Sequence, residues 1–172
     1  RTPNVMTTDF LITIEIDGVT SVRARTVKQS QELKNPRTLA KFEIERQYWV
    51  RRGIDWKIIT EKQIDEALVF NTEYVHNCRT LDGFAYVTPE MVKQIIVMLK
   101  ANDSDRVSSL AALTASIDFE LGFAGGTSLF VFKHLVANRI IKVDMTIPIR
   151  TGKPIGYEIA LTTLKTEDAR YA

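Results

Sequence analysis

The sequence predicts two units in succession: an α/β unit with a mixed sheet, then three helices followed by a β-hairpin. Alternating apolar residues that end at Asp17-Gly18 indicate a hairpin, because Asp-Gly suits a tight turn. Apolar residues near helical spacing over residues 36–52 indicate a helix that covers the sheet. Thr88-Pro89 starts the second unit as a capped helix. These signals divide the chain into residues 1–85 and 86–172.

The first hairpin has one strand over residues 9–16 and a return strand over residues 19–28. Apolar side chains occupy every second position of the first strand, which predicts one well-buried face. These side chains are Phe10, Ile12, Ile14 and Ile16. The helix over residues 36–52 then leads to a short strand over residues 56–60. This long crossover predicts a mixed sheet covered by helices.

Residues 63–87 are predicted to be transitional, because they carry turn signals: Asn71, Asn77 and Asp82-Gly83. The second unit then shows three helix starts, at Thr88-Pro89, at about Ser109 and at Thr127, which is expected to cap the third helix. Residues 140–147 and 156–161 predict two strands. Three helices followed by a hairpin is the order of a winged-helix domain.

Composition excludes several classes of protein. The chain has 172 residues, of which 45% are hydrophobic and 26% charged, as in ordinary globular proteins. Its single cysteine, Cys78, excludes a disulfide framework and a zinc cluster built on several thiolates. No apolar run approaches the roughly 20 residues that a membrane span needs. With no apolar signal core at the N-terminus, we expect a cytoplasmic protein.

Positive charge is concentrated in one stretch of a nearly neutral chain. The net charge is +2, but residues 21–62 hold eleven basic and five acidic side chains, a local net charge of +6. Such a stretch suits a phosphate backbone, and it also suits an ordinary solvated helix face. Charge alone leaves both interpretations open.

The hairpin register brings together groups with a common chemical use. With a two-residue turn, Asp9 faces Thr26, and Thr26 and Lys28 project to one face. A carboxylate binds Mg²⁺, a bound metal activates water, and a lysine stabilises charge on a phosphate. This is the arrangement of the PD-(D/E)xK nucleases. The alternative is an exposed Asp and Lys that merely flank a hairpin.

Several segments together resemble one known family. They are Val5–Leu11, Thr26-Val27-Lys28 and Arg37–Trp49, followed by Ile54–Trp56, Thr60–Ile64, Asp118–Gly122 and Ala169–Tyr171. The pattern is similar to TnsA, the endonuclease subunit of a heteromeric bacterial transposase. The resemblance implies a restriction-endonuclease-like domain that lacks its N-terminal part, followed by a winged-helix domain. The likeness is specific over the first 65 residues and looser afterwards.

The resemblance also implies an activity and its partners. The family uses Mg²⁺ (or Mn²⁺) to cut the 5′ strands at transposon ends, while a DDE-type transposase cuts and joins the 3′ strands. An AAA+ ATPase regulator contacts the C-terminal domain. The family's metal-binding Asp falls on Asp9, its catalytic Lys on Lys28 and a metal ligand on Thr26. The Val27 carbonyl is a further candidate ligand, and so is Glu45, for which a solvent-facing position is equally open.

Two departures from the family pattern matter. The family carries a further catalytic Glu ahead of the Asp strand, and the eight residues before Asp9 hold none. We therefore expect a fragment of a longer nuclease, or else a catalytically incomplete chain. Thr26 stands where the fold usually has Glu or Gln, and a neutral hydroxyl is a poorer Mg²⁺ ligand than a carboxylate.

Two other functional classes stay open. The chain is either this nuclease or a non-catalytic adaptor between the transposase and its ATPase, and a third alternative is an unrelated winged-helix transcription factor. The third helix offers few groove-reading side chains, namely Lys133, His134, Asn138 and Arg139, so protein docking is favoured over DNA readout. Trp49 and Trp56 are expected to be core anchors.

Overall fold

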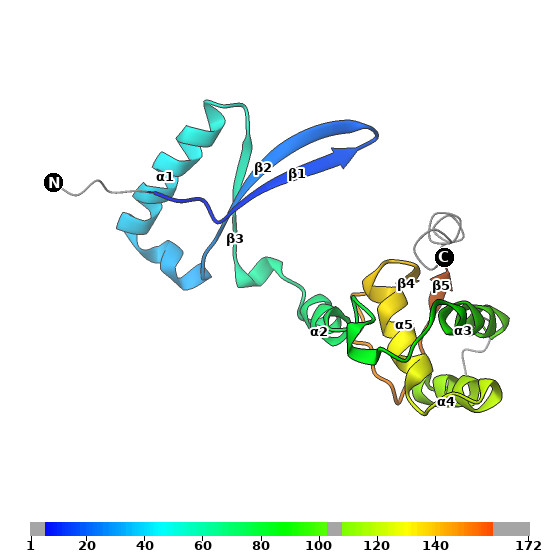
Figure 1. Ribbon diagram of the computed structural model, residues 1–172. Coiled ribbons are helices and arrows are strands. Elements are labelled where there is room, and N and C mark those ends of the chain that lie inside the picture. The colour runs from blue at the N-terminus through cyan, green and yellow to red at the C-terminus, as the bar shows by residue number, and fades with distance from the viewer. Residues whose placement is uncertain (1–5, 103–107, 160–172) are drawn as a thin grey trace. The chain divides into compact units, whose positions relative to one another are not determined.

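A computed structural model describes residues 6–102 and 108–159 (Figure 1). Along the chain, two compact units divide between Ile64 and Asp65. Two predicted segments, the end of the last strand at residues 160–161 and Ala169–Tyr171, lie outside the described residues. Within the described residues, no helix is long and apolar enough to span a membrane.

The first unit is a three-stranded mixed sheet with one long helix. Its elements are β1 (Phe10–Ile16), β2 (Val19–Val27), the 3-10 helix η1 (Ser30–Lys34), α1 (Pro36–Val50), β3 (Asp55–Ile59) and the 3-10 helix η2 (Glu61–Gln63). β2 lies in the centre, antiparallel to β1 and parallel to β3. The predicted mixed sheet and its long crossover are confirmed.

The hairpin has the predicted register. Phe10 pairs with Arg25 and Ile16 with Val19, which leaves Asp17 and Gly18 as the two turn residues. Both have positive φ, 52° and 75°, as a turn that follows the right-handed strand twist requires. The register fixes which side chains reach the α1 side of the sheet.

The apolar row of β1 is not buried as predicted. Phe10 and Ile16 are 54% and 55% exposed. The covering helix α1 lies on the other face, where Ala24 and Thr26 are buried and the Trp56 indole donates a hydrogen bond to Glu45 of α1. Alternation along β1 places Phe10 and Ile16 on the face away from α1, which the described residues leave exposed.

The second unit has four α-helices and a two-stranded sheet among its described residues. They are α2 (Glu66–His76), α3 (Pro89–Ala101), α4 (Leu110–Leu121), α5 (Thr127–Ala137), β4 (Ile141–Val143) and β5 (Tyr157–Ile159), with the 3-10 helix η3 (Asp82–Phe84) between α2 and α3. β4 and β5 pair antiparallel. The three predicted helices and the hairpin are present in order. β4 is shorter than predicted, because the Asp144 side chain accepts from the Thr146 N–H and turns the chain.

Residues 65–85 belong to the second unit, so the predicted boundary at 85/86 differs from the observed one. The expected transitional segment contains α2, which Asp65 caps by accepting from the N–H groups of Ala67 and Leu68. Asn71, read as a turn signal, is fully buried in this helix. Its amide donates to the carbonyls of Met145 and Ile147 and accepts from Ile149 N. These bonds tie α2 to the later part of the unit.

The last helix of the second unit, α5, is capped by a carboxylate from α4. The Asp118 side chain is buried and accepts from Gly126 N at 2.7 Å and Ser128 N at 2.8 Å. Thr127, the predicted cap, instead donates its hydroxyl to the Ala124 carbonyl. Negative charge at a helix N-terminus is stabilising, so Asp118 fixes how α5 follows α4.

His134 makes the second unit sensitive to acid. Its ring is buried and its Nδ1 donates to the Cys78 carbonyl at 2.8 Å. Burial lowers the pKa of His134 below 6.5, and the hydrogen bond to Cys78 only partly opposes this. The neutral ring therefore contributes stability that is fully present above pH 6.5 and is lost as the pH falls through the lowered value.

We expect the second unit to unfold at lower urea concentration at about pH 5 than at about pH 7.5. Both tryptophans lie in the first unit, so tryptophan fluorescence follows that unit. Far-UV circular dichroism is dominated by the second unit, which holds four of the five described α-helices. His134→Gln removes the titrating ring and should flatten the pH dependence of the second unit. An equal pH dependence in the variant would contradict this assignment.

Candidate functional site

A cleft between the C-terminal end of β2 and α1 collects the candidate residues of the first unit. Its volume is about 330 Å³. All five residues singled out from the sequence line it, together with five others: Thr7, Asp9, Thr26, Val27, Lys28, Glu32, Thr38, Lys41, Phe42 and Glu45. The hairpin register therefore brings together the predicted strand residues, and α1 adds Glu45.

Asp9 is held at the mouth of the hairpin by the backbone of β2. One carboxylate oxygen accepts from the Val27 N–H at 2.7 Å. This side-chain bond lies just beyond the last backbone pair of the hairpin, Phe10 with Arg25. It uses one of the two carboxylate oxygens and places the carboxylate next to the Val27 backbone.

Glu45 is buried, contrary to the solvent-facing alternative. It is 7% exposed, and one of its carboxylate oxygens accepts three hydrogen bonds. The donors are Thr26 Oγ1 at 2.5 Å, Thr8 Oγ1 at 2.6 Å and Trp56 Nε1 at 3.1 Å. Burial of a carboxylate is tolerated when donors surround it. Glu45 thus fixes the position of Thr26 on the floor of the cleft.

The two tryptophans serve this network as well as packing. Trp49 Nε1 donates to Thr8 Oγ1 at 2.8 Å, and Trp56 Nε1 reaches both Glu45 and Thr26. Each ring therefore anchors a polar residue near the site. The sequence predicted core anchors but gave no signal for these bonds, which depend on how α1 lies over the sheet.

Lys28 lies opposite a carboxylate that the sequence reasoning missed. Its Nζ forms an ion pair with Glu32 at 2.7 Å, and the side chains are 34% and 48% exposed. The spacing of four residues between Lys28 and Glu32 is the sequence signal that could have predicted this ion pair. In this arrangement the ammonium of Lys28 is held in the cleft by a group that a phosphate can replace.

The loop that carries Lys28 and Glu32 is fixed from β3. The Lys28 N–H donates to the Ile59 carbonyl at 2.9 Å, which extends the parallel pairing. Glu61 accepts from both the Ser30 N–H and the Ser30 hydroxyl. These bonds from Ser30 lower the pKa of Glu61. The segment Thr60–Ile64, which is part of the family resemblance, therefore holds this loop in place through Glu61.

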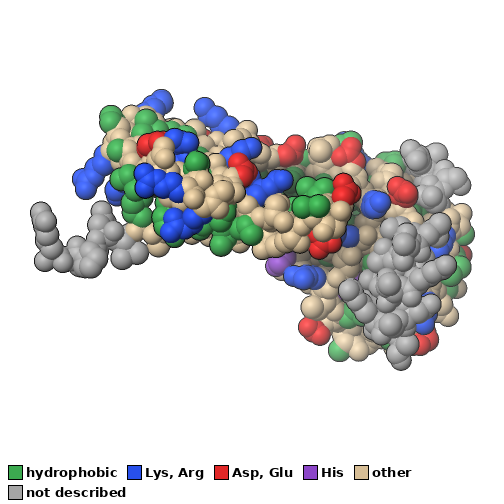
Figure 2. Space-filling view, turned by 90° about the horizontal axis from the view of Figure 1, so that it is seen from above, with side chains coloured by type: hydrophobic (Ala, Val, Ile, Leu, Met, Phe, Trp, Pro, Cys, Tyr) green, Lys and Arg blue, Asp and Glu red, His purple; other side chains and the backbone are tan. Residues whose placement is uncertain are grey.

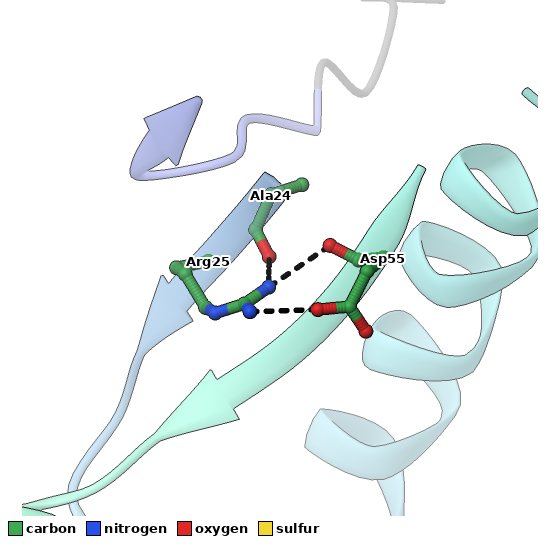
Figure 3. A network of polar contacts seen from close by, with 3 residues as sticks. All are labelled: Ala24, Arg25 and Asp55. Atoms are coloured by element: carbon green, nitrogen blue, oxygen red, sulfur yellow. Dashed lines mark hydrogen bonds and ion pairs between the residues drawn. The ribbon is translucent and has the colours of Figure 1, made fainter. Parts of the chain in front are cut away.

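An arginine fork joins β2 to β3 one residue before Thr26 (Figure 3). Arg25 Nη1 donates to the carbonyls of Ala24 at 2.7 Å and Asp55 at 2.9 Å. Its Nη2 donates to the Asp55 carboxylate at 2.7 Å. The hydrogen bond from Arg25 lowers the pKa of Asp55. The fork joins the start of β3 to β2, the strand whose C-terminal end lines the cleft, on the sheet face away from α1.

The oxygen donors of the cleft are of the kind that binds Mg²⁺ through few protein ligands. Mg²⁺ prefers oxygen ligands and is often bound by one or two carboxylates plus water and substrate phosphate. Asp9, Thr26 and the Val27 backbone line one wall of the cleft. In residues 6–102 and 108–159, no group of three His, Cys, Asp or Glu side chains is placed to hold a metal. The chain thus offers one well-placed carboxylate, and Glu45 is committed to Thr26.

Helix α5 and its C-cap Asn138 use their polar residues for packing. His134 is buried against Cys78, and the Asn138 amide donates to the Arg79 carbonyl at 3.0 Å. The Lys133 ammonium lies 3.7 Å from the centre of the Tyr74 ring. Few of the candidate groove-reading groups on this helix are therefore left to contact bases.

Comparisons with known proteins agree with this geometry. A family model described as "TnsA-like endonuclease N terminal" matches residues 1–61, and one described as "TnsA endonuclease C terminal" matches residues 63–145. The chain belongs to the TnsA family. The TnsA models meet at the same place as the two structural units. Membership excludes the alternative of an unrelated winged-helix transcription factor.

One curated relative is similar over most of this chain. It is the "Transposon Tn7 transposition protein TnsA" of Escherichia coli, 30% identical over 149 residues, which are 87% of this chain and 53% of the relative. The chain thus spans about half the length of that TnsA protein. The restriction-endonuclease-like α/β fold that the family implies is consistent with the mixed sheet and its helix in the first unit.

Proposed function

We propose that this chain belongs to a Mg²⁺-dependent (or Mn²⁺-dependent) DNA endonuclease that cuts the 5′ strands at transposon ends. The observation that carries the proposal is the convergence of Asp9, Thr26, Val27, Lys28 and Glu45 on one cleft, in a member of the TnsA family. The reaction is hydrolysis of a phosphodiester within DNA transposition.

The proposal gives each residue the role that the resemblance implies and that its position in the cleft allows. Asp9 would hold the metal ion with the Val27 carbonyl and the Thr26 hydroxyl. The bound metal would polarise the phosphodiester and activate water. Lys28 would leave Glu32 and stabilise the charge that develops on the phosphate. Glu45 would keep Thr26 in place, because it accepts the Thr26 hydroxyl hydrogen.

The proposal includes partners. A DDE-type transposase subunit would cut and join the 3′ strands, and an AAA+ ATPase regulator would dock on the second unit. The order α3–α4–α5–β4–β5 supports a winged-helix assignment for that unit. The buried polar residues of α5 favour protein docking over base reading. A DNA substrate in a bacterium places the reaction in the cytoplasm.

The test is strand-specific nicking of transposon-end DNA with Mg²⁺ and the cognate transposase. It uses this chain and a version extended upstream of Arg1, since the chain spans about half of its relative. We expect 5′-strand cutting that Asp9→Asn reduces by at least about a hundredfold. Lys57→Ala is the control, because Lys57 follows Trp56 and projects away from α1.

A second function, a non-catalytic adaptor between transposase and ATPase, is favoured by one observation. Thr26 supplies a neutral hydroxyl, and among the described residues the cleft lacks a group of three acidic or imidazole ligands. An adaptor would form the complex with its partners, and neither the wild type nor Asp9→Asn would cut. That outcome would overturn the nuclease.

A further inference from the structure

Two cations on α1 and a third two residues after its end lie along one side of the helix, and one of them, Lys41, lines the cleft. Arg37, Lys41 and Arg52 are all exposed, as are Ile44 and Tyr48 between them. Positions 37, 41, 44, 48 and 52 are spaced by three or four residues, so these side chains form one row on the helix. We call Arg37, Lys41 and Arg52 the α1 basic row.

The row borders two neighbouring hollows. Lys41 lines the cleft with Asp9 and Lys28, whereas Ile44 and Tyr48 line a neighbouring hollow of about 540 Å³. Thr7 and Glu45 line both the cleft and this neighbouring hollow, so the two lie side by side along α1. An extended ligand in the cleft would therefore continue along α1 past Tyr48.

The charges of the row are not neutralised within the described part of the chain. None of Arg37, Lys41 and Arg52 forms an ion pair there, whereas Arg46, off the row, is paired with Glu43 at 2.8 Å and Lys28 with Glu32. The Arg52 guanidinium lies 3.5 Å from the centre of the Tyr48 ring, which holds it in place without cancelling its charge. Lys and Arg side chains are frequent on the first-unit surface that Figure 2 shows.

We propose that the α1 basic row binds the phosphate backbone of the DNA strand that enters the cleft, with Lys41 contacting the phosphate nearest the site. The inference rests on the proposed nuclease function and adds the path of its substrate. A strand carries repeated negative charges, so cations at several points along α1 can each meet a phosphate of the same strand. An arginine or lysine forms a charge-assisted hydrogen bond to a phosphate oxygen.

The test is DNA binding measured by fluorescence anisotropy, with a short fluorescein-labelled duplex and Ca²⁺ in place of Mg²⁺. Backbone contacts are independent of sequence, so any duplex serves. We expect Lys41→Ala to raise Kd about fivefold at low salt and to reduce the slope of log K against log salt by about 0.9. Lys57→Ala removes the same charge on the face away from α1 and should change both quantities much less.

Cleavage separates binding from chemistry. Lys41→Ala should slow cutting at limiting DNA and cut at the wild-type rate at saturating DNA. The proposed contact binds the substrate and the transition state equally, so its loss raises KM and leaves kcat unchanged. Equal affinities and salt slopes for the wild type, Lys41→Ala and Lys57→Ala would contradict DNA binding by the α1 basic row, even if the nuclease function is confirmed. DNA binding that depends on Lys41, without any cutting by the wild type, would contradict the proposed nuclease function and support DNA binding by the α1 basic row.

Discussion

Lys28→Ala is expected to slow single-turnover cleavage by about 10²- to 10³-fold at saturating DNA, because in the proposed mechanism Lys28 stabilises the charge that develops on the phosphate. The ammonium of Lys28 lines the cleft with Asp9 and is paired there with Glu32. The Mg²⁺ concentration at half-maximal rate should stay within about threefold, since Lys28 is not a metal ligand. Single-turnover rates at saturating DNA and varied Mg²⁺ give both values.

Two further variants sharpen this result. Lys28→Arg keeps a positive charge but not the compact ammonium, so it should recover only part of the rate. Glu32→Gln releases Lys28 and should lower Kd for DNA, because the phosphate no longer displaces a carboxylate. Lys57→Ala is the charge-matched control. A Lys28→Ala protein that cuts at the wild-type rate would contradict the catalytic assignment.

Glu45→Ala is expected to destabilise the first unit by about 3 kcal/mol, because it leaves buried donors without an acceptor. The donors are the hydroxyls of Thr8 and Thr26 and the Trp56 indole. Urea unfolding followed by tryptophan fluorescence measures this change, since Trp56 belongs to the same network. The second unit, followed by circular dichroism, should unfold as in the wild type.

Glu45→Gln distinguishes a positioning residue from a metal ligand. Glutamine keeps an oxygen that can accept from Thr26, so a positioning role predicts a modest loss of stability and an unchanged Mg²⁺ requirement. A metal ligand would instead lose charge, and the Mg²⁺ concentration at half-maximal rate would rise at least about tenfold. That rise, with normal stability, would refute the positioning role.

The site was predictable where local rules fix geometry. The Asp17-Gly18 turn and the alternation of β1 set the register, and the register predicts that Asp9 faces Thr26, next to the Val27 N–H from which its carboxylate accepts. Lys28 follows two residues after Thr26 on the same strand end. The assignment of roles to these residues came from the resemblance, since their spacing alone also fits exposed charges beside a hairpin.

Other features depended on tertiary contacts that no local pattern contains. Alternation predicted a buried face on β1, but it does not say which face α1 covers, and Phe10 is exposed. Asn71 was read as a turn residue, whereas buried carbonyls of a distant segment satisfy its amide within α2. Because α2 was not predicted, the predicted domain boundary lay at 85/86 and not at 64/65. Glu32 and Lys41 gained significance only once α1 and η1 defined the cleft.

β1 is an edge strand of the described sheet, and its exposed side chains give it a tendency to self-associate. The segment Phe10–Ile16 is rich in β-branched and aromatic residues and carries one charge, Glu15. Edge strands of this composition pair readily with other chains, which proteins commonly prevent with lysine, proline or a bulge. The antiparallel hairpin has none of these along β1. We therefore expect the chain to self-associate through this edge in concentrated solution, and charged substitutions at Phe10 or Ile16 to keep it monomeric.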